Sequence, residues 1–133
     1  MISSSIIKPL GKMKTIPDLS GFTGTLQYHR LSGNLKYTDG FIYLAQKVGC
    51  YWLSDIISSV QELDSIKTNE FIIWRIIVQG NTAIVTAYSD CEEDGTYTND
   101  KLLYKQKILY TDFPRGIFEF YQINDVVLLK SEY

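Results

Sequence analysis

The chain has 133 residues, of which 45% are hydrophobic and 21% charged, with a formal net charge of −2 at pH 7. This length suits one domain with one core, and the composition is that of a globular protein, which disfavours a disordered, fibrous or membrane-embedded chain. The 13 Lys and Arg residues are scattered, which disfavours a general polyanion-binding protein because binding to phosphates depends on clustered positive charge.

Residues 1–20 contain two of the three prolines and show little periodicity. We predict an N-terminal tail there, of a composition compatible with disorder, ahead of a single α+β domain at residues 21–133. The tail lacks the apolar run of a signal peptide, and no window has the length of a membrane span. Cys50 and Cys91 lack Cys-x-x-Cys spacing and suit free thiols. The protein is therefore expected to be cytoplasmic, without membrane association.

Residues 21–36 alternate weakly between apolar and polar side chains and then turn at the Ser-Gly-Asn cluster of residues 32–34. This pattern predicts either an extended arm or an edge hairpin. A first short helix follows, because Thr38 or Asp39 offers an N-cap oxygen and apolar residues recur at helical spacing from Phe41 to Val48.

Gly49 ends this first helix, since glycine stabilises a helix poorly and often forms its C-terminal cap. A second apolar stripe begins at Trp52 or Leu53. It continues at helical spacing through Leu63 and predicts an amphipathic second helix.

The hydrophobic period changes near Lys67 from that of helices to that of strands. Residues 71–78 form a nearly continuous β-branched and aromatic run, typical of a central strand. Further strands are predicted at 82–88, 102–110, 117–122 and 126–129, joined by turn residues. Short connections favour antiparallel neighbours. We therefore predict an α+β fold in which two N-terminal helices pack on one face of a curved antiparallel sheet of four or five strands.

The tripeptide Tyr-Thr-Asp occurs twice, at 37–39 and at 110–112. Each copy lies where a predicted element begins or ends. Thr and Asp side chains form hydrogen bonds with nearby backbone groups at such places. We interpret the repeated tripeptide as capping and turn chemistry in preference to a binding motif.

Several short motifs together resemble a family of small uncharacterised bacterial proteins, a domain of unknown function. The resemblance covers about residue 21 to the C-terminus, and it rests on segments at 23–28, 37–40, 43–45, 49–55, 110–114 and 131–133. It supplies no activity. Members are often encoded in plasmid, phage or cyanobacterial contexts, so the resemblance implies a role in the biology of mobile elements.

No catalytic or metal-binding motif stands out in the chain. His29 is the only histidine, and nothing in the spacing places it beside a nucleophile. The acidic loop at 90–95 lacks the ligand spacing of a calcium loop and is expected to be a solvated turn. We therefore predict a protein without enzymatic activity, cofactor or metal.

The ten Tyr, six Phe and two Trp residues exceed the usual need of a core this size, so some are expected on a surface. Aromatic anchors carry much of the energy of protein interfaces. The leading prediction is therefore a protein-binding function, through an inhibitory contact with a host defence or regulatory complex or through a homodimer. The candidate residues are Tyr28, His29, Arg30, Tyr43, Tyr51 and Trp52.

The alternative is a single-stranded nucleic-acid binder, because aromatic residues on a sheet can stack unpaired bases while lysines hold phosphates. The candidates are Tyr104, Lys105, Lys107 and Tyr110. Strand alternation places the two tyrosines on the face opposite the two lysines. The aromatic residues could then belong to the core that faces the helices.

Overall fold

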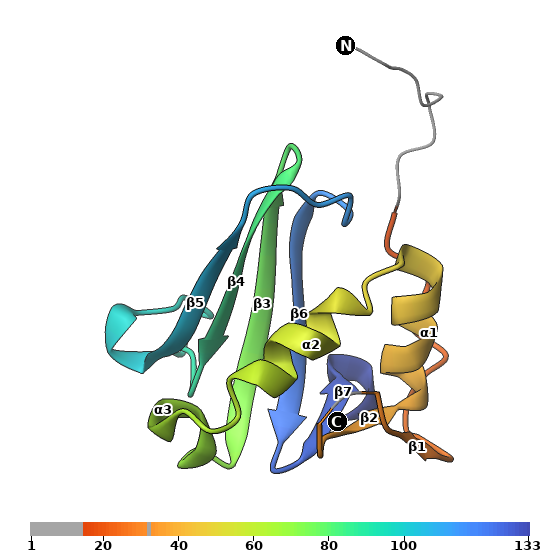
Figure 1. Cartoon of the computed structure of the whole chain (residues 1–133), viewed down its shortest axis with the longest axis horizontal. Coiled ribbons are helices and arrows are strands. Elements are labelled where there is room, and N and C mark those ends of the chain that lie inside the picture. The colour runs from red at the N-terminus through yellow and green to blue at the C-terminus, as the bar shows by residue number, and fades with distance from the viewer. Residues whose placement is uncertain (1–14, 32) are drawn as a thin grey trace.

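The computed structural model describes residues 15–31 and 33–133, and a mixed β-sheet lies against helices on one of its sides (Figure 1). The α+β class predicted from the sequence is confirmed. The strands of the sheet are β1 (Tyr28–His29), β2 (Lys36–Thr38), β3 (Phe71–Gln79), β4 (Thr82–Tyr88), β5 (Leu102–Ile108), β6 (Gly116–Ile123) and β7 (Val126–Leu129). The helices are α1 (Asp39–Val48), α2 (Trp52–Ser59) and α3 (Asp64–Lys67), with short 3-10 turns at η2 (Asn99–Lys101) and η3 (Lys130–Glu132).

The sheet order is β1-β2-β7-β6-β3-β4-β5. Strands β3 to β7 lie where the sequence predicts them, and their pairings are antiparallel. The prediction of a purely antiparallel sheet of four or five strands is wrong, because the described sheet has seven strands and β2 runs parallel to β7. β1 and β2 have only two and three residues, too few for an alternation signal. β1 pairs antiparallel with β2, so of the two alternatives for the arm the edge hairpin is the one observed.

Helix α1 has the predicted limits. The Thr38 side chain accepts a hydrogen bond from the backbone N–H of Phe41, and Gly49 ends the helix at φ 76°, in the left-handed region that favours glycine. The predicted second helix is too long, since α2 ends at Ser59 and α3 is separate. The Gln61 side chain donates to the carbonyl of Ile57 at 2.9 Å and thus caps the end of α2.

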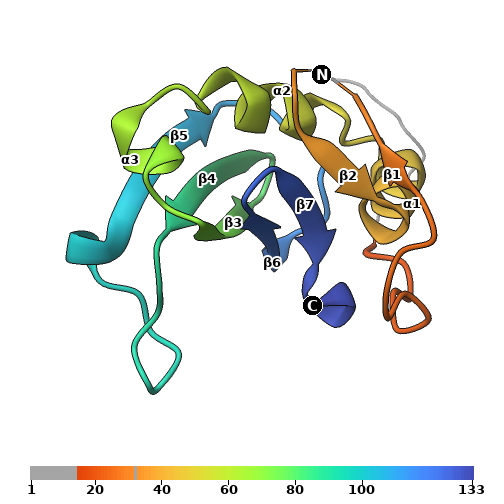
Figure 2. The same ribbon diagram turned by 90° about the horizontal axis from the view of Figure 1, so that it is seen from below.

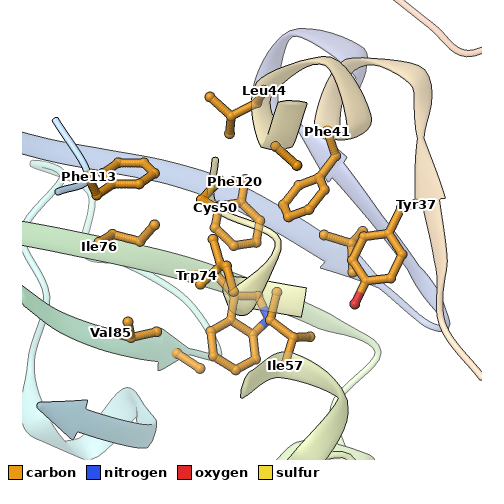
Figure 3. Packing of buried hydrophobic residues seen from close by; sticks show 14 of the residues in the cluster. Tyr37, Phe41, Leu44, Cys50, Ile57, Trp74, Ile76, Val85, Phe113 and Phe120 are labelled. Carbon is orange, nitrogen blue, oxygen red and sulfur yellow. The ribbon is translucent and has the colours of Figure 1, made fainter. Parts of the chain in front are cut away.

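The core lies between the helices and the side of the sheet that faces them (Figure 3). Trp74 and Ile76 of β3 and Phe120 of β6 are fully buried there against side chains of the helices such as Phe41 and Ile57. Figure 2 shows all three helices on this side. The opposite face of the sheet, which we call the open face, has no helix over it in the described part of the chain.

The predicted tail at residues 1–20 lies largely outside the described residues, which begin at residue 15. Ile16 and Leu19 are half-buried and pack against the core. The last residues of this segment therefore belong to the folded unit in packing, although they form no helix or strand.

A buried polar link ties the end of α2 to the sheet. Trp74 donates from its indole nitrogen to Gln122 Oε1 at 3.1 Å, and Gln122 Nε2 donates to Gln61 Oε1 at 2.8 Å. Gln122 is 3% exposed. Buried polar groups need hydrogen-bond partners, and Gln122 provides the acceptor for the indole N–H of Trp74. Its hydrogen bond to Gln61 links the end of α2 to the sheet.

We predict that Gln122→Leu lowers the free energy of unfolding by about 1–3 kcal/mol, because the buried indole N–H of Trp74 loses its acceptor. Urea denaturation measures the loss. Gln79→Leu, at the exposed end of β3, is the matched control and should change stability little. Equal stability of Gln122→Leu and the native protein would contradict this role of Gln122.

Candidate functional site

A groove of about 490 Å³ lies between α2 and the connection that follows β5. We call it the α2 groove. Its lining residues are Gly49, Trp52, Asp55, Ile56, Ile108, Tyr110, Thr111 and Asp112. Aromatic and aliphatic side chains thus share the groove with two carboxylates, and none of the eight residues is basic.

The α2 side of the groove is built by the break between α1 and α2. The left-handed turn at Gly49 reverses the chain, and Trp52 becomes the first residue of α2. Trp52 is half-buried and meets Phe113 edge-to-face, with ring centroids 6.5 Å apart. The core thus holds one part of the Trp52 side chain in place while another part lines the groove.

The opposite wall comes from the segment between β5 and β6. The backbone N–H of Thr111 donates to the carbonyl of Asn81 at 2.7 Å, and the Thr111 hydroxyl accepts from the N–H of Phe113. These bonds hold the backbone beside Tyr110, whose side chain is 74% exposed. Tyr is one of the residues enriched among those that carry most of the energy of protein binding, so Tyr110 is a candidate anchor.

Asp55 and Asp112 give the groove its negative charge. Asp55 lies in the first turn of α2, where a carboxylate is favoured by the partial positive charge of the helix N-terminus. Asp112 closes the second Tyr-Thr-Asp copy. In the first copy Thr38 caps α1, and in the second Thr111 stabilises a turn, so both copies make the capping and turn hydrogen bonds expected of them. In addition, the second copy contributes all three of its residues to the groove.

The predicted protein-binding residues fall into separate places. Trp52 lines the groove, whereas Tyr28, His29 and Arg30 belong to the β1 arm at the other end of α1. The ten residues of α1 span about 15 Å. Tyr43 packs against Phe22 with ring centroids 5.1 Å apart.

Tyr51 lies between α1 and α2 and is 40% exposed. The Tyr43 ring is covered by Lys47, whose Nζ lies 5.4 Å from the ring centroid. Because the β1 arm and Trp52 lie at opposite ends of α1, the six candidates do not form one surface.

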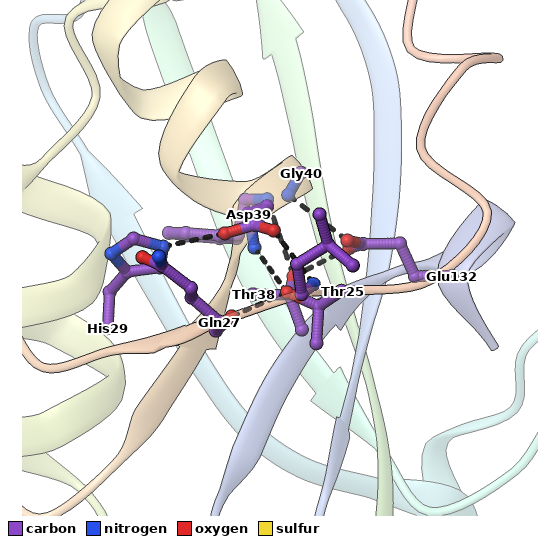
Figure 4. A network of polar contacts seen from close by, with 9 residues as sticks. Thr25, Gln27, His29, Thr38, Asp39, Gly40 and Glu132 are labelled. Carbon is purple, nitrogen blue, oxygen red and sulfur yellow. Dashed lines mark hydrogen bonds and ion pairs between the residues drawn. The ribbon is translucent and has the colours of Figure 1, made fainter.

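The arm is held by a polar network at the start of α1 (Figure 4). His29 Nε2 lies 2.7 Å from Asp39 Oδ1, and the N–H of Leu26 donates to Asp39 Oδ2. Glu132, near the C-terminus, accepts from the Thr38 hydroxyl at 2.6 Å and from the N–H of Gly40. His29 is thus a structural partner of Asp39 in this network.

The nucleic-acid candidates are divided by the sheet. Tyr104 faces the helices and meets Trp74, with ring centroids 6.4 Å apart, whereas Lys105 and Lys107 are exposed on the open face. This separation follows the predicted alternation. Tyr110 lies beyond the end of β5 and lines the groove beside Trp52. The structure therefore brings together, in one groove, Trp52 from the protein-binding candidates and Tyr110 from the nucleic-acid candidates.

A family model described as a family of unknown function, DUF6876, matches residues 13–133. The chain belongs to the DUF6876 family. The resemblance to an uncharacterised family is confirmed at that level, and both walls of the groove lie within the matched DUF6876 region. Comparison with curated proteins and with solved structures found no match. Within residues 15–31 and 33–133, no helix has the length and apolar character needed to cross a bilayer.

The network at the start of α1 predicts a pH dependence of stability. Hydrogen bonds from His29 and from the N–H of Leu26 hold the pKa of Asp39 below its ordinary value of 3.8. A carboxyl group whose pKa is lowered on folding stabilises the native state above its unfolded pKa, and this contribution is lost as pH falls through the folded pKa.

We therefore expect Asp39→Asn to be less stable than the native protein at about pH 5, with a gap that closes as the pH falls towards about 2. Urea denaturation across this range measures the gap. A gap that stays constant or widens with acid would show that Asp39 is not stabilised as a carboxylate.

Proposed function

We propose that this DUF6876 protein is a non-enzymatic binding protein whose α2 groove receives a segment of a partner protein that carries an Arg or Lys side chain. The observation that carries the proposal is the convergence of two aromatic side chains, Trp52 and Tyr110, with two carboxylates, Asp55 and Asp112, in one groove. Each of these side chains has a separate reason to favour such a segment.

The aromatic residues provide the apolar part of the contact. A cation over the face of Trp or Tyr is attracted by about 0.5–2 kcal/mol, depending on how far it is removed from water. Trp52 is already held by Phe113, and the backbone around Tyr110 is held by Thr111. Binding would therefore order few additional groups, which lowers its entropic cost.

The carboxylates provide selectivity for charge. Asp55 and Asp112 repel an acidic segment and attract a basic one, and complementary charge contributes more to selectivity and association rate than to affinity. Ile56 and Ile108, also in the lining, favour an apolar residue next to the cation. The preferred segment thus combines one basic and one apolar side chain.

A narrower form of the proposal names the biological setting. The resemblance to proteins of mobile elements supports a bacterial inhibitor that acts in the cytoplasm by occupying the surface of a host defence or regulatory complex. A second copy of the chain is the other protein partner considered, and the mass in solution, measured by light scattering, separates a homodimer from a monomer that binds a foreign partner.

A single-stranded nucleic-acid binder is the second candidate function. Lys105 and Lys107 support it, because both are exposed and share the open face of β5. Tyr104 does not, because its ring faces the helices and its hydroxyl donates to Gln106 at 2.7 Å. Neither candidate tyrosine lies on the face of Lys105 and Lys107 to stack a base there. Protein binding is therefore the better supported function.

The nucleic-acid candidate has a direct test. Fluorescein-labelled oligo(dT) and oligo(U) at low salt should give no anisotropy change that depends on Lys105 and Lys107, because two lysines release too few counterions for tight binding. Binding that is lost in the double variant Lys105→Glu/Lys107→Glu would favour the nucleic-acid function instead.

For the groove, the sharpest test is selection of random peptides displayed on phage against the immobilised full chain. We expect enriched peptides to combine Arg or Lys with an apolar residue. Their affinity, measured by fluorescence anisotropy, should fall about tenfold in Tyr110→Ala, as for a truncated aromatic anchor. In Asp55→Asn it should fall by a smaller factor, of about three.

Leu109→Ala is the matched control. Leu109 is the neighbour of Tyr110 and is 76% exposed, yet it does not line the groove. Peptides that bind Leu109→Ala as well as the native protein but not Tyr110→Ala support the proposal. Enrichment of acidic peptides, or equal binding by both variants, would contradict it.

A further inference from the structure

A row of polar side chains crosses the open face of the sheet, away from the α2 groove. Arg75 of β3 pairs in register with Thr86 of β4 on one side and with Glu119 of β6 on the other. Lys130, which follows β7, lies next to Glu119. Directly paired residues share a face, so these side chains form one cluster.

Arg75 is the centre of this cluster, and its side chain is only 15% exposed. Its Nε donates to Glu119 Oε2 at 2.8 Å, and its guanidinium carbon lies 4.2 Å from the ring centroid of Tyr97. Tyr97 comes from the loop between β4 and η2. The guanidinium is therefore held by an ion pair at one edge and by an aromatic ring over one face.

Glu119 is fully engaged by donors. It accepts from Arg75, from the Tyr97 hydroxyl at 3.1 Å and from Lys130 Nζ at 3.0 Å. Burial acts to raise the pKa of Glu119, but the hydrogen bonds from Lys130 and Tyr97 outweigh it and hold the pKa below its ordinary value. The carboxylate is thus ionised at neutral pH, and the cluster of two cations and one anion carries a net positive charge.

The terminal amino groups of Arg75 form no hydrogen bond within the described residues. Among residues 15–31 and 33–133, its only hydrogen-bond acceptor is Glu119, through Nε, so the terminal amino groups Nη1 and Nη2 have no protein acceptor. The neighbouring Thr86 is 3% exposed, and its hydroxyl oxygen also lacks a partner. Half-buried guanidinium donors without acceptors are the feature expected of a site for an oxyanion.

A cavity of about 570 Å³ lies beside these donors. It forms where β6 continues past the end of β7, since β7 pairs with β6 only over Phe120–Ile123. Arg75, Glu119 and Lys130 provide its polar wall. Its apolar lining comes from Leu19, Ile117, Phe118 and Leu129. Ile117 shares the face of Arg75, whereas Phe118 and Leu129 pair with core residues, so the cavity lies at the edge of β6. The volume is within the range typical of sites for small organic ligands.

We propose that this cavity binds a small organic carboxylate, with the carboxylate group on Arg75 and Lys130 and an apolar body against Ile117, which shares the face of Arg75. Arg75 is suited to the carboxylate because the fork of its terminal amino groups matches two carboxylate oxygens. Glu119 does not compete for these donors, because it holds Arg75 through Nε. The site is separate from the α2 groove, with which it shares no lining residue.

The test uses octanoate as the probe and octanamide as its neutral counterpart of the same length. Octanoate added to the full chain, labelled with ¹⁵N, should shift the Nε–H resonance of Arg75. Octanamide should bind at least about tenfold more weakly, because it lacks the charge-assisted hydrogen bonds. Equal binding of both probes, or no shift of Arg75 with octanoate, would overturn the proposal.

Substitutions then separate the site from a general effect of charge. Lys130→Gln should weaken octanoate binding several-fold without unfolding the protein, since Lys130 is about half exposed. Arg75→Lys keeps the charge but removes the fork, and it should also weaken binding. Arg115→Gln, an exposed arginine outside the cavity lining, is the matched control. An equal loss in Arg115→Gln would show that octanoate responds only to net charge.

Discussion

The parallel pairing of β2 with β7 is the constraint on which the rest of the structure depends. It joins the N-terminal arm to the C-terminal strand, and Glu132 then accepts hydrogen bonds from Thr38 and Gly40 at the start of α1. The position of α1 at this edge of the sheet determines where Gly49 reverses the chain and where α2 crosses the sheet (Figure 1). The α2 wall of the groove follows from this contact between the two ends of the domain, whereas the other wall is held by the hydrogen bond from Thr111 to Asn81.

The sheet separates two environments that serve different chemistry. On the side of the helices, the groove lies at the edge of the helix layer, where Trp52 and Tyr110 are only partly covered. On the open face, Arg75 is held by Glu119 and Tyr97 beside a separate cavity. The two sites differ in sign of charge, negative in the groove and net positive around Arg75. One small domain therefore presents two sites that favour ligands of opposite charge.

Local signals in the sequence were sufficient for much of the fold and for little of the site. The cap at Thr38, the break at Gly49 and strands β3 to β7 depend on short-range chemistry, and each lies where it was predicted. The pairing of β2 with β7 depends on contacts between distant segments, which no local pattern reports. For the same reason Trp52 and Tyr110 are predicted for two different functions, because they come from segments far apart in the sequence that meet only in the folded chain.

The measurement that tests the central claim most directly is a ¹H–¹⁵N chemical-shift titration of the labelled full chain with a peptide containing arginine and leucine. The account predicts perturbations concentrated at residues 49–56 and 108–112, and much weaker perturbations with the citrulline analogue of the peptide. Perturbations centred on the β1 arm or on the open face, or equal responses to arginine and citrulline, would contradict the claim that the α2 groove binds a basic segment.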